Sequence, residues 1–520
     1  MKVITTQEMR DLEIRCEKEY AISPLQLMEN AGRGIAEWVT KFVSDKNLTK
    51  KILIVCGGGN NGGDGFVAAR YLQNQGAEAR VVCLTDLGAL KGPAKINFNK
   101  IKKIKKIKKI VVHKACNKEQ FEKIKSAFDV PVILDCILGT GLKNEVRGYL
   151  REVIDYINTL TSVVISVDIP SGMDGNTGAG NAIRAFATLT LGLPKTGLLK
   201  PANVDTVGFL NVVDIGIPKE LVRDANSSIN YMCADDFAGL IPKRKPSGHK
   251  GKFGHVLVIA GSPRYTGAAE LCVRGALRSG AGLVTLGATN GLRPVYQTKF
   301  TEAMTLGLPE TEDGALSYEA HPYILKFIEN VDSVAIGPGL GRHPDTLKLI
   351  KKIISESRKP VVADADAIHA IAEEPLVLRK AHAPIIITPH PGEMADLLHM
   401  QVKNVLNEKL TITRELAGKY GITVVLKGFH TAVAESDKKI YINSSGNPGM
   451  SSGGMGDVLT GIIASFLAQG INTLNSSRLG VFIHGAAGDL VSSEKGEIGV
   501  LASDLIEKLP CVLNRICGIR

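Results

Sequence analysis

The sequence predicts an α/β protein of two domains, each with a doubly wound parallel β-sheet between layers of helices. The length of 520 residues suffices for more than one domain of about 100–200 residues. Short apolar runs rich in β-branched residues alternate with helical segments, which is typical of buried parallel strands. A polar, basic segment rich in Pro and Gly at 218–253 separates two such series, and we interpret it as a linker.

The first half of the chain opens with two helical segments and then alternates strands and helices. Helices are predicted at 6–20, 24–43 and 65–76. Strands are predicted at 51–59, 79–84, 131–137, 162–170, 187–192 and 209–216. Because these strands are apolar throughout and separated by helices, they favour a parallel sheet covered on both faces.

The second half repeats the α/β pattern with different motifs. Strands are predicted at 255–261, 281–288, 333–339, 360–368, 384–393 and 423–428. A Gly-rich turn then opens a long apolar helix at 453–470. The glycine motifs of the two halves differ in order and spacing, so we expect a fusion of two unlike domains rather than a duplication.

Composition excludes several protein classes and narrows the partners. A chain with 44% hydrophobic residues is not a disordered protein. The formal net charge of +11 raises nucleic acids, anionic membranes and anionic small molecules as partners. Seven lysines lie in the run KIKKIKKIKKI (100–110), and without them the charge of +11 would fall to +4.

The isoleucines of this run recur every three residues, which predicts a short helix with an apolar stripe and a solvated basic face. No aromatic residues lie between the lysines, as stacking on single-stranded nucleic acid would require. We therefore expect no membrane partner and do not favour a nucleic acid, which stays the alternative interpretation of the run.

Cysteine usage and the start of the sequence indicate the compartment. The nine cysteines are odd in number, scattered and never in C-x-x-C spacing, which favours free thiols in a reducing cytosol. Charges in residues 1–13 do not fit a signal peptide, and no apolar run approaches the ~18–20 residues needed to span a bilayer. We expect a soluble, cytoplasmic protein.

The segment GGGNNGGDGF (57–66) follows a strand and leads into a helix. Glycines let backbone N–H groups approach a phosphate, and a helix N-terminus favours an anion. The segment lacks the Lys-Ser/Thr of a P-loop and offers instead the side-chain oxygens of Asn60, Asn61 and Asp64. The alternative is a generic tight turn without a ligand. The two Asn and the Asp in this turn argue against that alternative.

Two aspartates, Asp135 and Asp168, follow predicted strands of the first half, where doubly wound sheets bind ligands. A carboxylate there can be a general base, a metal ligand or a structural cap. Together, Asn61, Asp135 and Ser171 offer only hard oxygen ligands, which suit a group I or II cation better than zinc.

In the second half, GNPGMSSGGMGDVLTG (446–461) places glycine amides and Asp457 at the start of an apolar helix. Phosphoryl transfer needs this combination, because amides stabilise charge on the transferred group and a carboxylate takes the proton of the attacking hydroxyl. A helix-capping role is the alternative for Asp457. A nucleotide-contacting turn at Lys427-Gly428 and a strand-end pair, His390 and Glu393, are weaker signals.

These and further motifs occur in the order of one known family. In the first half they are NAG (30–32), GGGNNGGDGFVAAR (57–70), DCILGTG (135–141), VDIPSGMDGNTG (167–178) and LGLPKTGL (191–198). In the second half they are HKGKFGHVLVIAGS (249–262), GAAELCVRGALRSGAGLVT (267–285), GPGLGR (337–342), DADAI (364–368), TPHPGEM (388–394), LKG (426–428) and the segment at 446–461. On these motifs essentially the whole chain resembles the bifunctional NAD(P)H-hydrate repair enzymes, in which an NAD(P)H-hydrate epimerase is fused to an ADP-dependent NAD(P)H-hydrate dehydratase.

The resemblance implies a Rossmann-like three-layer αβα epimerase domain at 1–222 and a ribokinase-like αβα dehydratase domain at 223–520. It implies hydrate contacts in the epimerase from Asn60, Asn61, Gly62, Gly63, Asp64, Gly139, Thr140, Gly141, Leu142, Lys143, Asn144, Glu145 and Asp168. Hydrate contacts in the dehydratase would come from Ala268, Gly339, His390 and Asp457. Contacts to ADP or its AMP part would come from Lys427, Gly428, Phe429, His430, Thr431 and Gly456.

The resemblance also implies the catalytic residues and the cofactors. Asp168 would be the acid/base of the epimerase, Asp457 the base of the dehydratase, and Asn61, Asp135 and Ser171 the ligands of a potassium ion. Mg²⁺ is the expected phosphate partner in the dehydratase, although the sequence shows no dedicated carboxylate cage. The motif LPKTGL suggests that Lys195 supports the first site in a role left open.

The implied substrates are the hydrates of NADH and NADPH, with ADP as co-substrate and AMP, phosphate and NAD(P)H as products. Because the family tends to form symmetric multimers, a homo-oligomer is expected. Two alternatives stay open: a small-molecule kinase of the ribokinase-like superfamily with an accessory N-terminal domain, and an N-terminal domain that serves only as a binding module.

Overall fold

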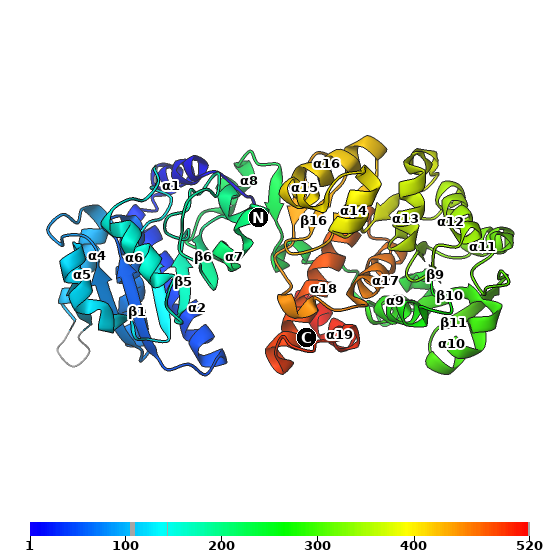
Figure 1. The fold of residues 1–520 in the computed structure, drawn as a ribbon, viewed down its shortest axis with the longest axis horizontal. Helices are drawn as coiled ribbons and strands as arrows, with labels where there is room; N and C mark the ends of the chain where they lie inside the picture. Colours follow the sequence, from blue (N-terminus) through cyan, green and yellow to red (C-terminus); the bar gives the residue numbers. More distant parts are fainter. Residues whose placement is uncertain (105–109, 143, 518–520) are drawn as a thin grey trace. The chain divides into compact units, whose positions relative to one another are not determined.

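The computed structural model describes residues 1–104, 110–142 and 144–517. The chain divides into two compact units, at 1–227 and 228–520 (Figure 1). No helix of the described parts has the length and apolar character needed to cross a membrane. The central residues of the lysine-rich run, 105–109, lie outside the described residues; the helix before them ends at Lys102, and Ile101 and Ile110 are buried.

The first unit contains a seven-stranded sheet in the order β3-β2-β1-β4-β5-β6-β7, and every neighbouring pair is parallel. The strands are β1 (Lys51–Cys56), β2 (Glu78–Cys83), β3 (Val111–Lys114), β4 (Val132–Cys136), β5 (Val163–Val167), β6 (Ala187–Leu191) and β7 (Phe209–Val213). The helices are α1 (Thr6–Tyr20), α2 (Pro24–Asp45), α3 (Asn60–Asn74), α4 (Gly92–Lys102), α5 (Lys118–Ile124), α6 (Tyr149–Ile157), α7 (Val204–Val207) and α8 (Lys219–Asp224).

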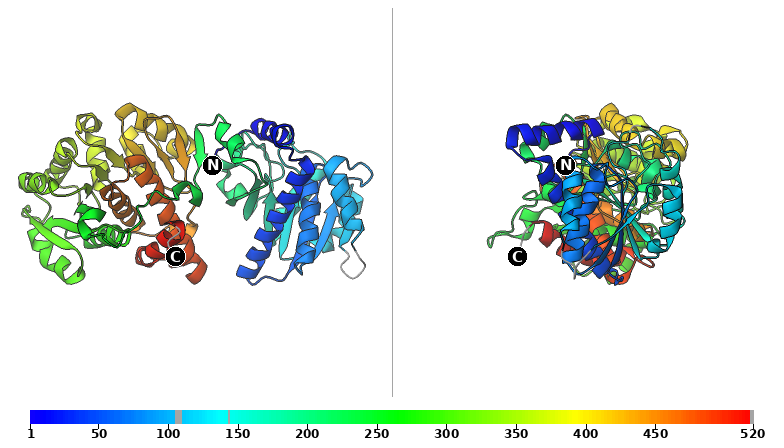
Figure 2. Two further views of the ribbon diagram at one scale, coloured as in Figure 1. Left: turned by 180° about the vertical axis from the view of Figure 1, so that it is seen from behind. Right: turned by 90° about the vertical axis from the view of Figure 1, so that its left-hand side faces the viewer.

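Alternate residues of the strands bury into two cores, one on each face of this sheet. On β1, Ile54 belongs to the core formed with α1 to α4, whereas Leu53 and Val55 belong to the core formed with α5 and α6. Figure 1 shows α5 and α6 in front of the sheet, and the view from behind in Figure 2 shows α2 on the other face. The unit therefore has the three-layer αβα architecture that was predicted.

The second unit contains a ten-stranded sheet in the order β11-β10-β9-β12-β13-β14-β15-β16-β17-β8. The strands are β8 (Ile229–Tyr231), β9 (His255–Ile259), β10 (Leu283–Thr289), β11 (Met304–Leu308), β12 (Ser333–Ile336), β13 (Val361–Ala363), β14 (Ile385–Ile387), β15 (Thr423–Leu426), β16 (Ala432–Ala434) and β17 (Ile440–Ile442). The helices are α9 (Thr266–Arg278), α10 (Arg293–Lys299), α11 (His321–Ile328), α12 (Pro344–Glu356), α13 (Asp366–Glu373), α14 (Pro391–Leu398), α15 (Val402–Asn407), α16 (Lys409–Tyr420), α17 (Met455–Ala468), α18 (Thr473–Lys495) and α19 (Ala502–Cys517).

This sheet also lies between two cores, because Val256 and Val258 of β9 pack with α9, α17 and α18, and Leu257 and Ile259 pack on the opposite side. It differs from the prediction at one end, where β15, β16 and β17 form antiparallel pairs. The short turn between β15 and β16 permits only a hairpin, since a parallel pair needs a crossover of a dozen or more residues.

The segment predicted as a linker, 218–253, is partly structured. It contains α8 of the first unit and β8, which pairs in parallel with β17 at the edge of the second sheet. Its polar composition hides β8, because a three-residue edge strand needs few apolar side chains.

Candidate active sites

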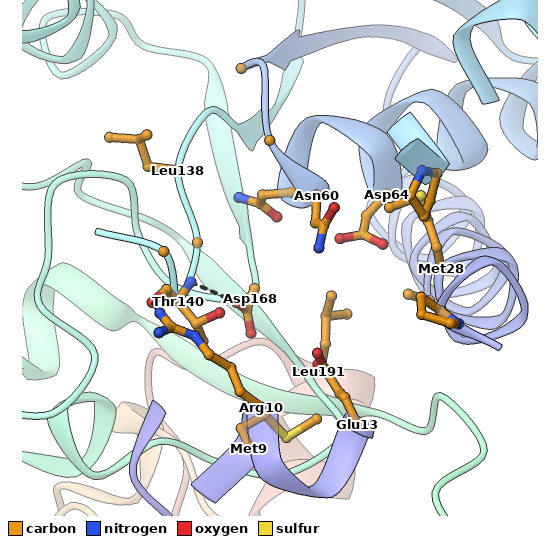
Figure 3. Close-up of a pocket in the computed structure, with 18 of the residues that line it drawn as sticks. Met9, Arg10, Glu13, Met28, Asn60, Asp64, Leu138, Thr140, Asp168 and Leu191 are labelled. Carbon is orange, nitrogen blue, oxygen red and sulfur yellow. Dashed lines mark hydrogen bonds between the residues drawn. The ribbon is translucent and has the colours of Figure 1, made fainter. Parts of the chain in front are cut away.

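A cavity of about 760 Å³ opens beside the carboxyl ends of β1, β4 and β5 in the first unit (Figure 3). This is where parallel sheets place ligands. The structure brings to its wall Asn60, Asn61, Asp64, Gly139, Thr140, Gly141, Leu142, Asp168 and Lys195. Four other predicted hydrate-binding residues, Gly62, Gly63, Asn144 and Glu145, are not among those lining the cavity. Lys143 lies outside the described residues.

The glycine-rich segment is more helical than predicted, because α3 begins at Asn60 rather than at residue 65. A Cβ on Gly62 would lie 2.1 Å from the Gly57 carbonyl oxygen, so only glycine lets the chain turn this tightly. The first N–H groups of a helix have no intrahelical acceptors. The start of α3 thus offers backbone donors to an anionic ligand.

Two polar side chains of this first turn, Asn61 and Asp64, are buried and have no hydrogen bond to another residue that the structure describes. Both polar atoms of the Asn61 amide lack a hydrogen bond within the described part of the chain. Asp64 is buried, and that burial, together with the charge of Asp168, raises its pKa well above the usual value. Buried polar groups in proteins normally have partners, so these two are available to a ligand.

Asp168 follows β5 with a φ of +67°, which is rare outside glycine and occurs preferentially at functional sites. Its Oδ1 lies 2.6 Å from Lys195 Nζ, and its Oδ2 accepts a hydrogen bond of 3.1 Å from the Thr140 N–H. Lys195 is 1% exposed and also donates to Thr190 Oγ1 and the Leu191 carbonyl. Lys195 and the Thr140 N–H therefore hold the Asp168 side chain in one orientation.

Asp135 and Ser171, predicted cation ligands with Asn61, lie together beneath this edge of the sheet. Ser171 donates its hydroxyl to Asp135 Oδ1 at 2.5 Å, and its N–H to Oδ2 at 2.9 Å. Ser166 Oγ and the Ile137 N–H complete four hydrogen bonds to this buried carboxylate, although burial still raises its pKa. The oxygen atoms of Asp135 and Ser171, and the Asn61 amide oxygen, which has no hydrogen bond among the described residues, are ligands of the hard type that an alkali-metal cation such as potassium prefers.

Helix α1 contributes two charged residues that sequence reasoning missed. Arg10 donates a hydrogen bond of 2.5 Å to the Thr140 carbonyl, and Glu13 lines the cavity. Burial and the Asp168 charge raise the pKa of Glu13. No local signal marks these residues, because only the tertiary fold brings α1 to the carboxyl ends of the strands.

The second unit has a cavity of about 780 Å³ that brings together three of its four predicted hydrate-binding residues, Ala268, Gly339 and Asp457. Gly454, at φ +89°, is the N-cap of α17, and a Cβ there would lie 2.3 Å from Leu271 Cδ1. Glycine is therefore required where α17 begins. The turn places Asp457 in the first turn of the helix beside its N-terminal N–H groups.

Burial is the main cause that raises the pKa of Asp457 to about 7, and the carboxylates of Asp364 and Asp366 raise it further. Lys427 lowers it, but this lysine is already bound to Asp364, 2.6 Å from Nζ to Oδ1. Thr460 Oγ1 donates to the other Asp364 oxygen at 2.8 Å. Sequence reasoning missed Asp364 as a site residue, although it follows a strand as Asp135 and Asp168 do.

His390 is not among the residues lining this cavity. It caps α14 instead, because its Nδ1 accepts hydrogen bonds from the Gly392 and Glu393 N–H groups, while Glu393 bonds back to the His390 N–H. Glu393 lies 4.0 Å from Lys427 Nζ, and burial raises its pKa to about 7. His390 thus adjoins the charged cluster around Lys427.

The predicted ADP contacts at 427–431 form the turn of the β15–β16 hairpin. Lys427 Nζ would lie 3.3 Å from a Cβ on Gly456, so this turn meets the start of α17. Thr431 Oγ1 donates to the Gly428 carbonyl, and the buried Lys409, which sequence reasoning missed, donates to the Phe429 carbonyl at 2.9 Å. Burial lowers the pKa of Lys409 to about 7. Burial is also the main cause that lowers the pKa of His430 to about 3.

Comparison with known proteins agrees with the division of the chain into two units. Family models described as "YjeF-related protein N-terminus" and "NAD(P)H-hydrate dehydratase" match residues 24–197 and 256–511. A bifunctional NAD(P)H-hydrate repair enzyme of Moorella thermoacetica is 39% identical, over 99% of this chain and 97% of its own length. The chain belongs to the bifunctional NAD(P)H-hydrate repair enzyme family. The Escherichia coli member is 34% identical, over 89% of this chain and 85% of its own.

Among solved structures, an ADP/ATP-dependent NAD(P)H-hydrate dehydratase from Bacillus subtilis, co-crystallised with ATP and Mg²⁺, is 28% identical. The matched region covers 55% of this chain and 98% of the Bacillus subtilis chain, with a TM-score of 0.48. The predicted family resemblance, the α/β fold and the bifunctional enzyme class are confirmed. The roles of individual site residues stay predictions.

Proposed function

We propose that this repair enzyme works through two separate sites, an epimerase cavity in the first unit and an ADP-dependent dehydratase cavity in the second. The observation that carries the proposal is that each cavity contains an aspartate set for proton transfer. Asp168 is held in place by Lys195 and the Thr140 N–H. Asp457 is half-buried at the start of α17, in a cavity shared with two other predicted hydrate contacts.

The epimerase substrate is the R or S hydrate of NADH or NADPH, in which water has added across the C5–C6 bond of the dihydronicotinamide. Its hydroxyl lies on the carbon bound to the ring nitrogen, so the nitrogen lone pair helps the hydroxyl to leave. Water then returns to either face of the planar intermediate. Asp168 moves the proton in this exchange, and the start of α3 and the loop at 139–142 hold the substrate.

A potassium ion, held by Asn61, Asp135 and Ser171, completes the first site in this proposal. The ion would supply positive charge next to the bound nucleotide. Support comes from the Asn61 amide, which is buried and has no partner within the described residues. The Ser171 hydroxyl accepts one hydrogen bond, from the Leu138 N–H, and retains a second lone pair. The Asp135 carboxylate accepts four hydrogen bonds and would contribute negative charge beside the ion.

In the second site, Asp457 takes the proton from the hydroxyl of the S hydrate while that hydroxyl attacks the terminal phosphoryl group of ADP. AMP leaves, and the phosphorylated hydrate loses phosphate and its C5 proton to give NAD(P)H. Backbone N–H groups at Gly453, Gly454 and Gly456 stabilise the charge on the transferred group. Lys427 and the turn at 428–431 bind ADP, and Mg²⁺ accompanies its phosphates.

We also propose that the protein is a cytoplasmic homo-oligomer. The eight cysteines whose side chains the structure describes are all free thiols, which supports a reducing compartment. Light scattering of the purified chain measures the oligomeric state directly, and a monomer at micromolar concentration would contradict this part.

The residue assignments are tested with separated R and S hydrates. Asp168→Asn is expected to lose epimerisation and to keep ADP-dependent dehydration of the S form. Asp457→Asn is expected to show the opposite. The dehydratase releases AMP, free phosphate and NAD(P)H, whereas a kinase would leave a stable phosphorylated product. Loss of both activities in either variant, with the fold intact, would contradict the two-site assignment.

A further inference from the structure

Helix α1 faces the epimerase cavity with Arg10 and Glu13, two residues that lie before the segment matched by the family model at 24–197. Figure 3 shows both side chains at the same cavity as Asp168. Arg10 fixes the loop after β4 through its hydrogen bond to the Thr140 carbonyl. Glu13 does not fix a neighbouring segment as Arg10 does, because its carboxyl has no hydrogen bond or ion pair within the described residues.

Burial, and after it the charge of Asp168, raises the pKa of Glu13. Asp168 and Asp64 face it from β5 and α3, and both carry a negative charge when ionised. Two cations also face it, Lys195 and Arg10, but Lys195 is bound to Asp168 at 2.6 Å and Arg10 to the Thr140 carbonyl. A half-buried carboxyl beside other carboxyls favours its neutral form. The pKa of Glu13 is therefore raised, whereas Asp168 accepts hydrogen bonds from Lys195 and from the Thr140 N–H.

Epimerisation needs one group that donates a proton and a second group that accepts a proton. The hydroxyl leaves one face of C6 as water, which requires a proton donor. A new water enters the opposite face and must lose a proton, which requires an acceptor. The reverse reaction exchanges the two roles, so a single carboxylate serves only half of each turnover unless solvent takes the other half.

We propose that Glu13 is the second catalytic acid–base residue of the epimerase and works as the partner of Asp168. This inference rests on the proposed epimerase function. Glu13 gives its proton to the leaving hydroxyl, the C6–O bond breaks, and the nitrogen lone pair forms the N1=C6 bond. Water then attacks C6, the N1=C6 electron pair returns to nitrogen, and Asp168 takes the released proton. Proton exchange with solvent restores both groups.

The test compares Glu13→Gln, Glu13→Asp and Glu19→Gln in the full chain. Glutamine retains the shape of Glu13 but cannot donate a carboxyl proton, so we expect the epimerisation rate to fall at least about 100-fold, mainly in kcat. Aspartate retains the proton on a shorter arm and is expected to recover part of the rate. Glu19, an exposed residue of the same helix paired with Arg15, is the control and is expected to leave the rate unchanged.

Circular dichroism and thermal unfolding of the same samples report whether the first unit of each variant is folded, and dehydration of the S hydrate with ADP checks that the second unit is unaffected. The unmodified protein is expected to lose epimerase activity at alkaline pH as Glu13 loses its proton, and Glu13→Gln is expected to lack that fall. A wild-type epimerisation rate in Glu13→Gln would overturn the inference, as would a slow variant with an unchanged alkaline limb. Absence of epimerisation in the unmodified protein would instead overturn the proposed function.

Discussion

The two aspartates that we propose as catalytic residues lie in different electrostatic settings. Asp168 is ion-paired with a buried lysine and accepts a backbone hydrogen bond. Asp457 is half-buried, and the charges of Asp364 and Asp366 add to the rise of its pKa to about 7. Lys427, which lowers this pKa, is bound to Asp364. The first carboxyl is thus fixed by direct partners, whereas the second has a raised pKa.

The raised pKa of Asp457, about 7, predicts the pH dependence of the dehydratase. Asp457 acts as a base only when ionised, so kcat/KM for the S hydrate with ADP is expected to rise through about pH 7 and then level off. Asp457→Asn is expected to lower the rate by about 10²- to 10⁴-fold. A variant that kept both the rate and the pH dependence would show that another group is the base.

Lys409 predicts a pH effect on stability. Burial lowers its pKa from 10.5 to about 7 in the folded chain, so between these values the unfolded chain binds the extra proton. Its contribution to the unfolding free energy therefore rises from about pH 7 to about pH 10.5 and is constant below pH 7. Chemical unfolding of Lys409→Met is expected to lack this rise of up to a few kcal/mol. Parallel pH curves for the two proteins would contradict it.

At the scale of elements, the long apolar strands and the helices beside them could be predicted from sequence alone. The three-residue strands β8, β16 and β17 could not, because so few residues carry no detectable periodicity. The residues at 60–64 were expected in a loop, since glycine disfavours helices. In the structure their contact with Gly57 outweighs that preference.

Some residues of the candidate sites could be predicted from the sequence, and others could not. Motif residues such as Asp168 and Asp457 could be predicted, because they lie in the segments that join strand ends or turns to helices. Glu13 and Lys409 could not, because each lies in an ordinary helix and comes to its site only through tertiary packing. The same packing gives Lys195 its role as the partner of Asp168.

The start of α3 predicts a sharp difference between two glycines. A Cβ on Gly62 would lie 2.1 Å from the Gly57 carbonyl oxygen, whereas a Cβ on Gly59 would meet no atom within 4 Å. Gly62→Ala is expected to lower the unfolding free energy by about 1–3 kcal/mol and to abolish epimerisation, because α3 must shift. Gly59→Ala is expected to cost under about 1 kcal/mol. Equal thermal unfolding of the two variants would contradict the packing argument.

At the scale of the whole molecule, each unit has its own sheet, its own cores and its own cavity. The described residues that line each cavity belong to a single unit. The epimerase enlarges the pool of S hydrate that the dehydratase consumes. The two activities therefore need only a shared diffusible intermediate, and the net charge of +11 suits ligands rich in phosphate.

The most direct measurement of the two-site account is NADH formation from purified R hydrate and ADP by two inactive variants, alone and mixed. Asp168→Asn alone is expected to produce NADH no faster than spontaneous epimerisation allows, and Asp457→Asn alone to produce it at least about 100-fold more slowly than the unmodified protein. Their mixture is expected to restore a rate near that of the unmodified protein, because the S hydrate formed by one chain reaches the other. A mixture as slow as Asp168→Asn alone would contradict the account.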